Sequence, residues 1–109
     1  MIQKKAEWLA ALRSGQYQQG KGLLFTGTGF CCLGVYAEVL GVPKRTSYTG
    51  SIGYDYMLTG NYDAYGIADR WASGLQKEDA VYLADTLNDD QGKTFAEIAD
   101  WIEANLEGE

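Results

Sequence analysis

The stretch that decides the fold is Cys31-Cys32-Leu33-Gly34-Val35-Tyr36-Ala37-Glu38-Val39-Leu40. Its side chains are apolar in almost every direction, and Glu38 carries the only charge. A helix that is apolar all round must be covered by its neighbours, so we expect residues 31–40 to form a buried central helix. A buried strand is the alternative, because so short an apolar run has no decisive period. Gly41 and Pro43 form a helix stop and favour the helix.

Upstream of this stretch, the pattern predicts a first helix and a short β-hairpin. Residues 2–14 carry apolar side chains at helical spacing, and Ser14-Gly15 is typical of a helix end. We expect Trp8 to anchor the core from this helix. Leu23–Thr26 is predicted to be a strand, and Gly27-Thr28-Gly29 is predicted to be the turn that leads toward the central helix.

Downstream, residues 44–66 are rich in tyrosine and glycine. The segments 51–54 and 56–59 are compatible with strands of a small sheet. Tyrosine and glycine also make adaptable contact surfaces, so this composition does not decide between a sheet and a binding surface. The sequence leaves the conformation of residues 42–75 open.

The last third of the chain predicts two helices joined by a short linker. Residues 78–87 carry one apolar stripe, and residues 88–93 form a polar connector. Thr94 and Glu97 have the spacing of a capping box, which predicts a helix start at Thr94. The expected buried face of that helix consists of Phe95, Ile98, Ala99, Ile102 and Leu106. These helices would form an antiparallel or angled αα-hairpin.

These elements together predict an α+β fold in a single domain over residues 1–109. Its expected parts are an N-terminal helix, a short β-hairpin, a buried central helix, a Tyr/Gly-rich β or loop section, and a C-terminal αα-hairpin. The chain has 109 residues, of which 46% are apolar, and one domain is the expected number for this length.

The composition excludes several kinds of chemistry. The chain has no histidine, which excludes imidazole acid–base catalysis, Ser-His or Cys-His nucleophile pairs, and imidazole metal sites. Cys31 and Cys32 are adjacent, so a disulfide between them would be strained, and two thiols alone cannot complete a zinc site. We therefore expect no enzyme activity, no metal and no cofactor.

The same features predict a cytoplasmic protein. Two cysteines that cannot pair easily suit a reducing compartment, where we expect them to be reduced and buried. No run of eighteen apolar residues and no signal-like leader is present, so we expect neither a membrane span nor secretion.

Charge is distributed unevenly along the chain, whose net charge is −6. Residues 1–54 carry six cations and two anions, whereas residues 55–109 carry three cations and thirteen anions. A basic half can bind an anionic ligand and an acidic half can bind a basic partner. Head-to-tail self-association would satisfy both halves, so we expect a homo-oligomer. Two solvated faces without a partner are the alternative.

Two segments in the acidic half resemble known motifs but lack residues that these motifs require. The connector around residues 85–92 lacks the glycine and glutamate positions of an EF-hand loop. The αα-hairpin resembles a helix-turn-helix, but its last helix carries Glu97, Asp100, Glu103 and Glu107 and no cation after Lys93. Such a helix would repel DNA, so we expect no DNA binding.

The best candidate binding site is an anion site in residues 13–22. Glycines beside a lysine allow backbone N–H groups to face an anion, and a guanidinium adds a planar, two-pronged donor. Tyrosine can stack on a base. A tight turn with a solvated lysine is the alternative. The candidate ligand-binding residues are Arg13, Tyr17, Gln19, Gly20, Lys21 and Gly22.

Three blocks of the sequence resemble a family of small phage and prophage proteins without an assigned activity. The blocks are W-x-x-A-L-R-S-G-x-Y-x-Q-G-x-G over residues 8–22, F-C-C-L-G-V over residues 30–35, and L-N-D followed by T-F-A-E-I-A-D-x-I-E within residues 87–103. The resemblance implies a phage accessory protein that works inside a bacterium.

Two binding functions follow from these observations, the first as the main hypothesis and the second as its alternative, and a structural or regulatory interaction protein is a third option. In the first, the protein sequesters a nucleotide-like anionic immune signal, with Arg13 and Lys21 holding phosphate and Tyr17 stacking on the base. In the second, the acidic half docks on a basic, nucleic-acid-binding host defence protein. Either would make the chain a non-enzymatic counter-defence factor.

Overall fold

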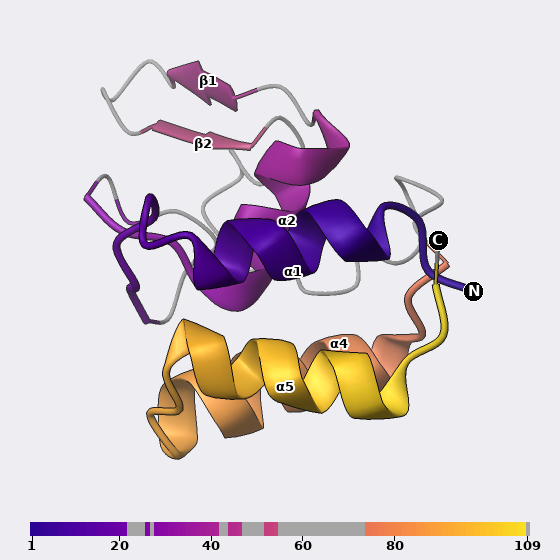
Figure 1. Ribbon diagram of the computed structural model, residues 1–109. Coiled ribbons are helices and arrows are strands. Elements are labelled where there is room, and N and C mark those ends of the chain that lie inside the picture. The colour runs from indigo at the N-terminus through magenta and orange to yellow at the C-terminus, as the bar shows by residue number, and fades with distance from the viewer. Residues whose placement is uncertain (22–25, 27, 42–43, 47–51, 55–73, 109) are drawn as a thin grey trace.

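The computed structural model describes residues 1–21, 26, 28–41, 44–46, 52–54 and 74–108. The elements are α1 (Lys5–Arg13), α2 (Cys32–Leu40), β1 (Lys44–Thr46), β2 (Ile52–Tyr54), α4 (Lys77–Val81), η2 (Tyr82–Asp90) and α5 (Phe95–Asn105). Helix α1 packs against both α2 and α5, and the two ends of the chain lie side by side (Figure 1).

The buried central helix predicted from the sequence is confirmed as α2. Its residues Cys32 to Ala37 are all buried, and Gly41 ends the helix with a left-handed φ of 80°. Cys31 and Cys32 form no disulfide, and burial raises the pKa of the Cys32 thiol well above its usual value. Glycine is favoured at position 41 because its missing Cβ removes the steric penalty of a left-handed φ.

The predicted first helix is confirmed with a later start. Lys4 has a left-handed φ of 54°, so the helix begins at Lys5 and not at Ile2. Ile2 instead donates its N–H to the carbonyl of Glu107 at 2.8 Å and forms a bridge with Gly108. The N-terminal residues are therefore fastened to the other end of the chain.

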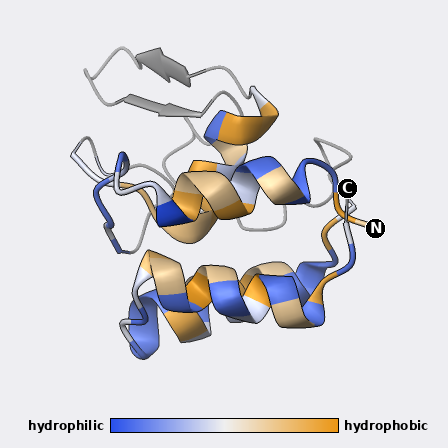
Figure 2. Ribbon diagram, viewed as in Figure 1, coloured by the Kyte–Doolittle hydropathy of each residue, from blue (hydrophilic) through white to orange (hydrophobic). Residues whose placement is uncertain are grey.

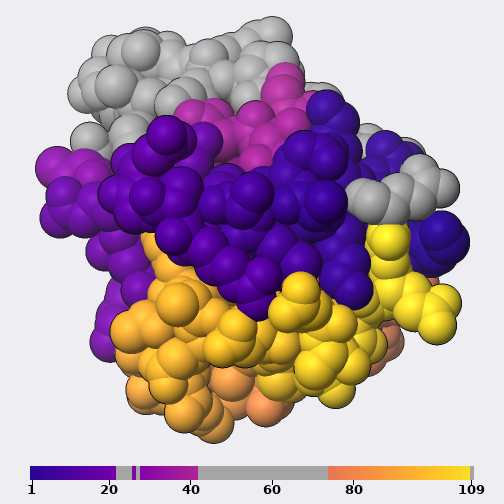
Figure 3. All heavy atoms as spheres, in the orientation of Figure 1, coloured from indigo at the N-terminus to yellow at the C-terminus, as the bar shows by residue number. Residues whose placement is uncertain are grey.

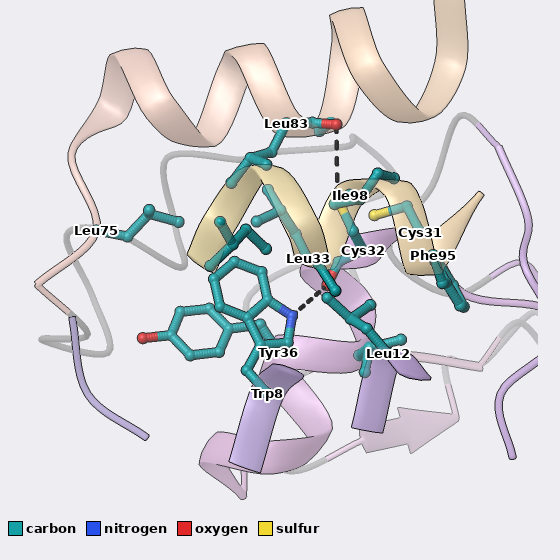
Figure 4. Close-up of a cluster of buried hydrophobic side chains, with 14 of the residues drawn as sticks. Trp8, Leu12, Cys31, Cys32, Leu33, Tyr36, Leu75, Leu83, Phe95 and Ile98 are labelled. Carbon is teal, nitrogen blue, oxygen red and sulfur yellow. Dashed lines mark hydrogen bonds between the residues drawn. The ribbon is translucent and has the colours of Figure 1, made fainter. Parts of the chain in front are cut away.

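Trp8 joins α1 to α2 as the predicted core anchor (Figure 4). It is fully buried, and its ring stacks on Tyr36 with centroids 4.0 Å apart. Its indole N–H donates to the carbonyl of Cys32 at 3.0 Å, and the Tyr36 hydroxyl donates to the carbonyl of Gln3 at 2.8 Å. Each polar atom of the two rings thus has a partner, which lets both rings enter the core.

The C-terminal αα-hairpin is confirmed, but its first helix is longer than predicted. Helix α4 continues into η2, a helix with π winding that extends through Asp90, so the connector shortens to residues 91–93. The N–H of Gln91 donates to the carbonyl of Thr86, five residues back. Both apolar and polar residues occur along α4 and α5, as expected for helices with one buried and one exposed face (Figure 2).

The α+β prediction is confirmed in its helical part, because the core described by the structure is helical. Its buried apolar residues lie on the helices or directly beside them. Strands β1 and β2 pair antiparallel, with Arg45 opposite Gly53, and they lie on the side of α1 away from α5 (Figure 1). The predicted strand at 56–59 and most of the predicted hairpin strand at 23–26 lie outside the described residues.

Candidate functional site

Arg13 lies at the end of α1, where it contacts α5. Its guanidinium forms ion pairs with Asp100 at 2.8 Å and Glu103 at 3.1 Å. The side-chain hydrogen bonds to Asp100 and then Glu103 raise the pKa of Arg13 above its usual value. The surfaces of α1 and α5 meet directly in Figure 3. Arg13 therefore fastens these helices together in the structure.

Gln19 and Gly20 belong to a polar network centred on Asn88. The Gln19 amide donates to the Asn88 side-chain oxygen at 2.9 Å and to the carbonyl of Lys93 at 2.7 Å. The Asn88 amide donates to the carbonyl of Gly20 and to the Asp89 carboxylate, each at 2.9 Å. This network holds residues 19–20 against the end of η2.

The other predicted ligand-binding residues lie around this network. The N–H of Gly20 donates to the carbonyl of Phe30, and Tyr17 packs edge-to-face on Phe30 with centroids 5.2 Å apart. Lys21 is exposed, and its ammonium group lies near Gly92. The Nζ atom is 3.5 Å from the position that a Cβ atom would take on that glycine. Gly22 lies outside the described residues.

Of the predicted site residues, Gln19 and Gly20 thus share the network around Asn88, whereas Arg13 points toward α5. It adds Asn88, a fully buried side chain that sequence reasoning did not select. The sequence held a signal that could have pointed to Asn88. This residue belongs to the L-N-D block and directly follows Leu87 in the buried stripe of η2. The anion site itself stays a prediction.

The C-terminal helices carry a strongly acidic surface. Residues 74–108 contain nine carboxylates and two cations, Lys77 and Lys93. Seven of these carboxylates are exposed: Glu78, Asp85, Asp90, Glu97, Asp100, Glu103 and Glu107. We call this set the acidic face. Exposed carboxylates are expected on helices that bury one stripe of apolar side chains and leave the opposite face to solvent.

An open groove of about 630 Å³ lies on α4 and η2. The described residues that line it are Lys77, Glu78, Val81, Tyr82 and Thr86, and most of its lining is apolar. Tyr82 is 38% exposed, and its ring contacts Trp101 of α5 with centroids 5.2 Å apart. The groove therefore combines an aromatic surface with nearby carboxylates.

Within the described part of the chain, no group of three or more Cys, Asp or Glu side chains is placed to hold a metal ion. Among the same residues, no helix is both long enough and apolar enough to span a membrane.

Residues 1–73, more than half of the chain, match the family described as "Domain of unknown function (DUF8296)". The chain belongs to this family. The matched residues include α1, α2, β1 and β2 and end before α4. No curated protein and no solved structure matches the chain.

Proposed function

We propose that this chain is a non-enzymatic binding protein that docks its acidic face on a basic surface of another protein. The observation that carries this proposal is the excess of nine carboxylates over two cations in residues 74–108. Carboxylates placed on packed helices present a fixed negative potential, which accelerates encounters with a basic partner and orients it.

The proposed partner is a basic, nucleic-acid-binding host defence protein. The resemblance to small phage proteins supports a bacterial setting for the interaction. A nucleic-acid-binding surface presents lysine and arginine to phosphate groups, and an acidic helical face can compete for the same cations. A counter-defence protein of this kind needs no catalytic group, which agrees with a sequence that has no histidine.

Sequestration of a nucleotide-like anion is the second proposal from the sequence. In the structure, two carboxylates occupy the Arg13 guanidinium, and the Gly20 N–H is bonded to Phe30. An anion would have to displace these partners, whereas Asp85 and Asp90 of the acidic face are exposed and can meet a basic partner directly. A thermal shift with cyclic dinucleotides or ADP-ribose derivatives that disappears in Arg13→Ala/Lys21→Ala would favour sequestration over docking.

The docking proposal is tested by capture from a bacterial lysate, followed by a nucleic-acid-binding assay on the purified captured protein. Asp85→Lys and Asp90→Lys each change an exposed residue of the acidic face. We expect each variant to reduce capture several-fold at low salt, and we expect salt to weaken capture by the original chain. The captured protein should lose DNA or RNA binding when the original chain is added.

Glu7→Lys is the matched control, because it changes the net charge by the same amount at an exposed position of α1. We expect it to leave capture nearly unchanged. Equal losses in all three variants would indicate a response to net charge alone and would contradict docking by the acidic face. An unimpaired nucleic-acid-binding activity of the captured protein would contradict the proposed inhibition.

A further inference from the structure

We infer that the groove on α4 and η2 receives the apolar face of a basic amphipathic helix from the partner. This inference rests on the proposed function, because it names the form in which a basic partner meets the acidic half. It adds a specific anchoring site to an interaction that the proposed function describes by charge alone.

The described lining of the groove runs along one side of a helix over a length that a partner helix can match. Lining residues Lys77, Val81 and Thr86 follow each other at intervals of four and five, so they lie along one side of the continuous α4–η2 helix. The lined stretch is about 13 Å long at a rise of about 1.5 Å per residue. A partner helix places anchors at i, i+3 or i+4 and i+7, which covers about 10 Å.

The lining provides a surface on which apolar anchors gain free energy. Tyr82 is one of two large apolar side chains that are exposed in the described chain, the other being Met1. Its contact with Trp101 holds the ring against α5, and Val81 is half-buried beside it. Covering preformed aromatic surface is favourable because little side-chain freedom is lost.

The charges near the groove select a basic occupant. Glu78 lines the groove four residues before Tyr82, and the exposed Asp85 follows Tyr82 by three residues on the same helix. On α5, Glu97 lies one helical turn before Trp101. Carboxylates therefore flank the aromatic pair on both helices and outnumber Lys77, the one cation among the described lining residues, which complements lysines beside the apolar face of the partner.

The test measures binding of the full chain to a fluorescent synthetic peptide of about eighteen residues, made of lysine and leucine with the leucines at helical spacing. A second peptide has the same composition in an order that destroys the apolar face. We expect the amphipathic peptide to bind about tenfold more tightly by fluorescence anisotropy, since only it combines charge with aligned anchors.

Two variants locate the site of binding. Thr86→Arg places bulk and a repelling charge in the groove, whereas Gln91→Arg adds the same charge at an exposed position beyond its lining. We expect Thr86→Arg to weaken the amphipathic peptide about tenfold and Gln91→Arg to weaken it less than about twofold. If Thr86→Arg fails to fold, Tyr82→Ala removes the exposed ring instead and should also weaken binding several-fold.

The outcomes separate this inference from the proposed function. Equal affinity of the two peptides, or equal effects of Thr86→Arg and Gln91→Arg, would overturn the groove site while leaving docking by charge intact. Failure of both peptides to bind at low salt would overturn the groove site and the acidic docking surface together.

Discussion

Asn88 is a buried amide whose hydrogen bonds connect two distant parts of the chain. Its side-chain nitrogen reaches the carbonyl of Gly20, and its oxygen accepts from Gln19. A buried polar group is stable only when its partners are present, so the loss of one member leaves the others desolvated and unbonded. This network therefore couples the loop after α1 to the end of η2.

We expect Asn88→Ala to lower the free energy of unfolding by about 2–4 kcal/mol, because it leaves the Gly20 carbonyl and the Gln19 amide without these partners. Asn105→Ala is the control, since its side chain is exposed and donates one bond to the carbonyl of Trp101. That change should cost less than about 1 kcal/mol. Urea unfolding measures both, and equal losses would mean that the network contributes no special stability.

At the residue scale, sequence reasoning identified packing better than polar partners. Trp8 was predicted as a core anchor from its place on an apolar stripe, and it is fully buried. Arg13 was predicted to hold an anionic ligand, and the structure pairs it with carboxylates about ninety positions away. A periodic pattern reports which face of a helix is buried, but it holds no information about which distant carboxylate will meet an exposed guanidinium.

At the scale of elements, the start of α5 depends on the predicted capping box, which is confirmed. Thr94 accepts from the N–H of Glu97 at 3.1 Å, and the Glu97 carboxylate accepts from the N–H of Thr94 at 3.0 Å. The hydrogen bond from the Thr94 backbone, followed by that from its side chain, lowers the pKa of Glu97 below its usual value. The carboxylate form thus stabilises the helix start.

The lowered pKa means that the folded state binds the Glu97 proton less readily than the unfolded chain does. Its stabilising contribution is present above the ordinary pKa of 4.5 and is lost as pH falls through the lowered value. Glu97→Gln keeps an oxygen for the Thr94 N–H and removes the titration. We expect its free energy of unfolding to fall less steeply than that of the original chain as the pH is lowered through this range.

Urea unfolding across the acid range measures this difference, and NMR titration of the Glu97 carboxyl gives an independent reading. Thr94→Ala removes the hydroxyl that helps to lower the pKa, so it should move the Glu97 titration back toward its usual range. Parallel stability profiles for Glu97→Gln and the original chain would contradict a role for the charged capping box in acid stability.

The start of α5 and the end of α2 were more predictable than the winding and length of η2. The Thr94 cap and the glycine after α2 act through nearby backbone atoms, so short motifs report them. Within the π-wound stretch of η2, which extends through Asp90, Asn88 meets residues 19–20, which lie almost seventy positions earlier. A local pattern cannot report that contact, and it predicted a polar connector there.

At the scale of the whole molecule, the helical core and the charge asymmetry were both readable from the sequence. The apolar period predicted α1, α5 and the continuous α4–η2 helix, because burial must follow the helix repeat. The buried central helix α2 was predicted instead from its apolar side chains in almost every direction and from the stop at Gly41 and Pro43. The β content of the prediction depended on short segments without a strong period. The groove was not predicted, because a local pattern does not report tertiary contacts such as that between Tyr82, which lines the groove, and Trp101 of α5.

The charge distribution predicts how salt affects the stability of the whole chain. Nine carboxylates on α4, η2, α5 and their flanking residues repel one another when the helices pack, and two cations offset little of this repulsion. Salt also weakens the attraction of Arg13 for Asp100 and Glu103, which acts in the opposite direction. Because the repelling pairs outnumber these two attractive contacts, screening should stabilise the folded chain.

We expect the midpoint of thermal unfolding to rise by roughly 2–5 °C as sodium chloride increases from about 0.02 M to about 0.5 M, where the screening length falls below about 5 Å. The double variant Asp85→Lys/Asp90→Lys has fewer like charges on this face, so its midpoint should rise by less over the same range. Differential scanning calorimetry measures both proteins. A midpoint that falls with salt in the original chain would show that the Arg13 contacts outweigh the repulsion, and the acidic face would then impose no electrostatic cost for a basic partner to relieve.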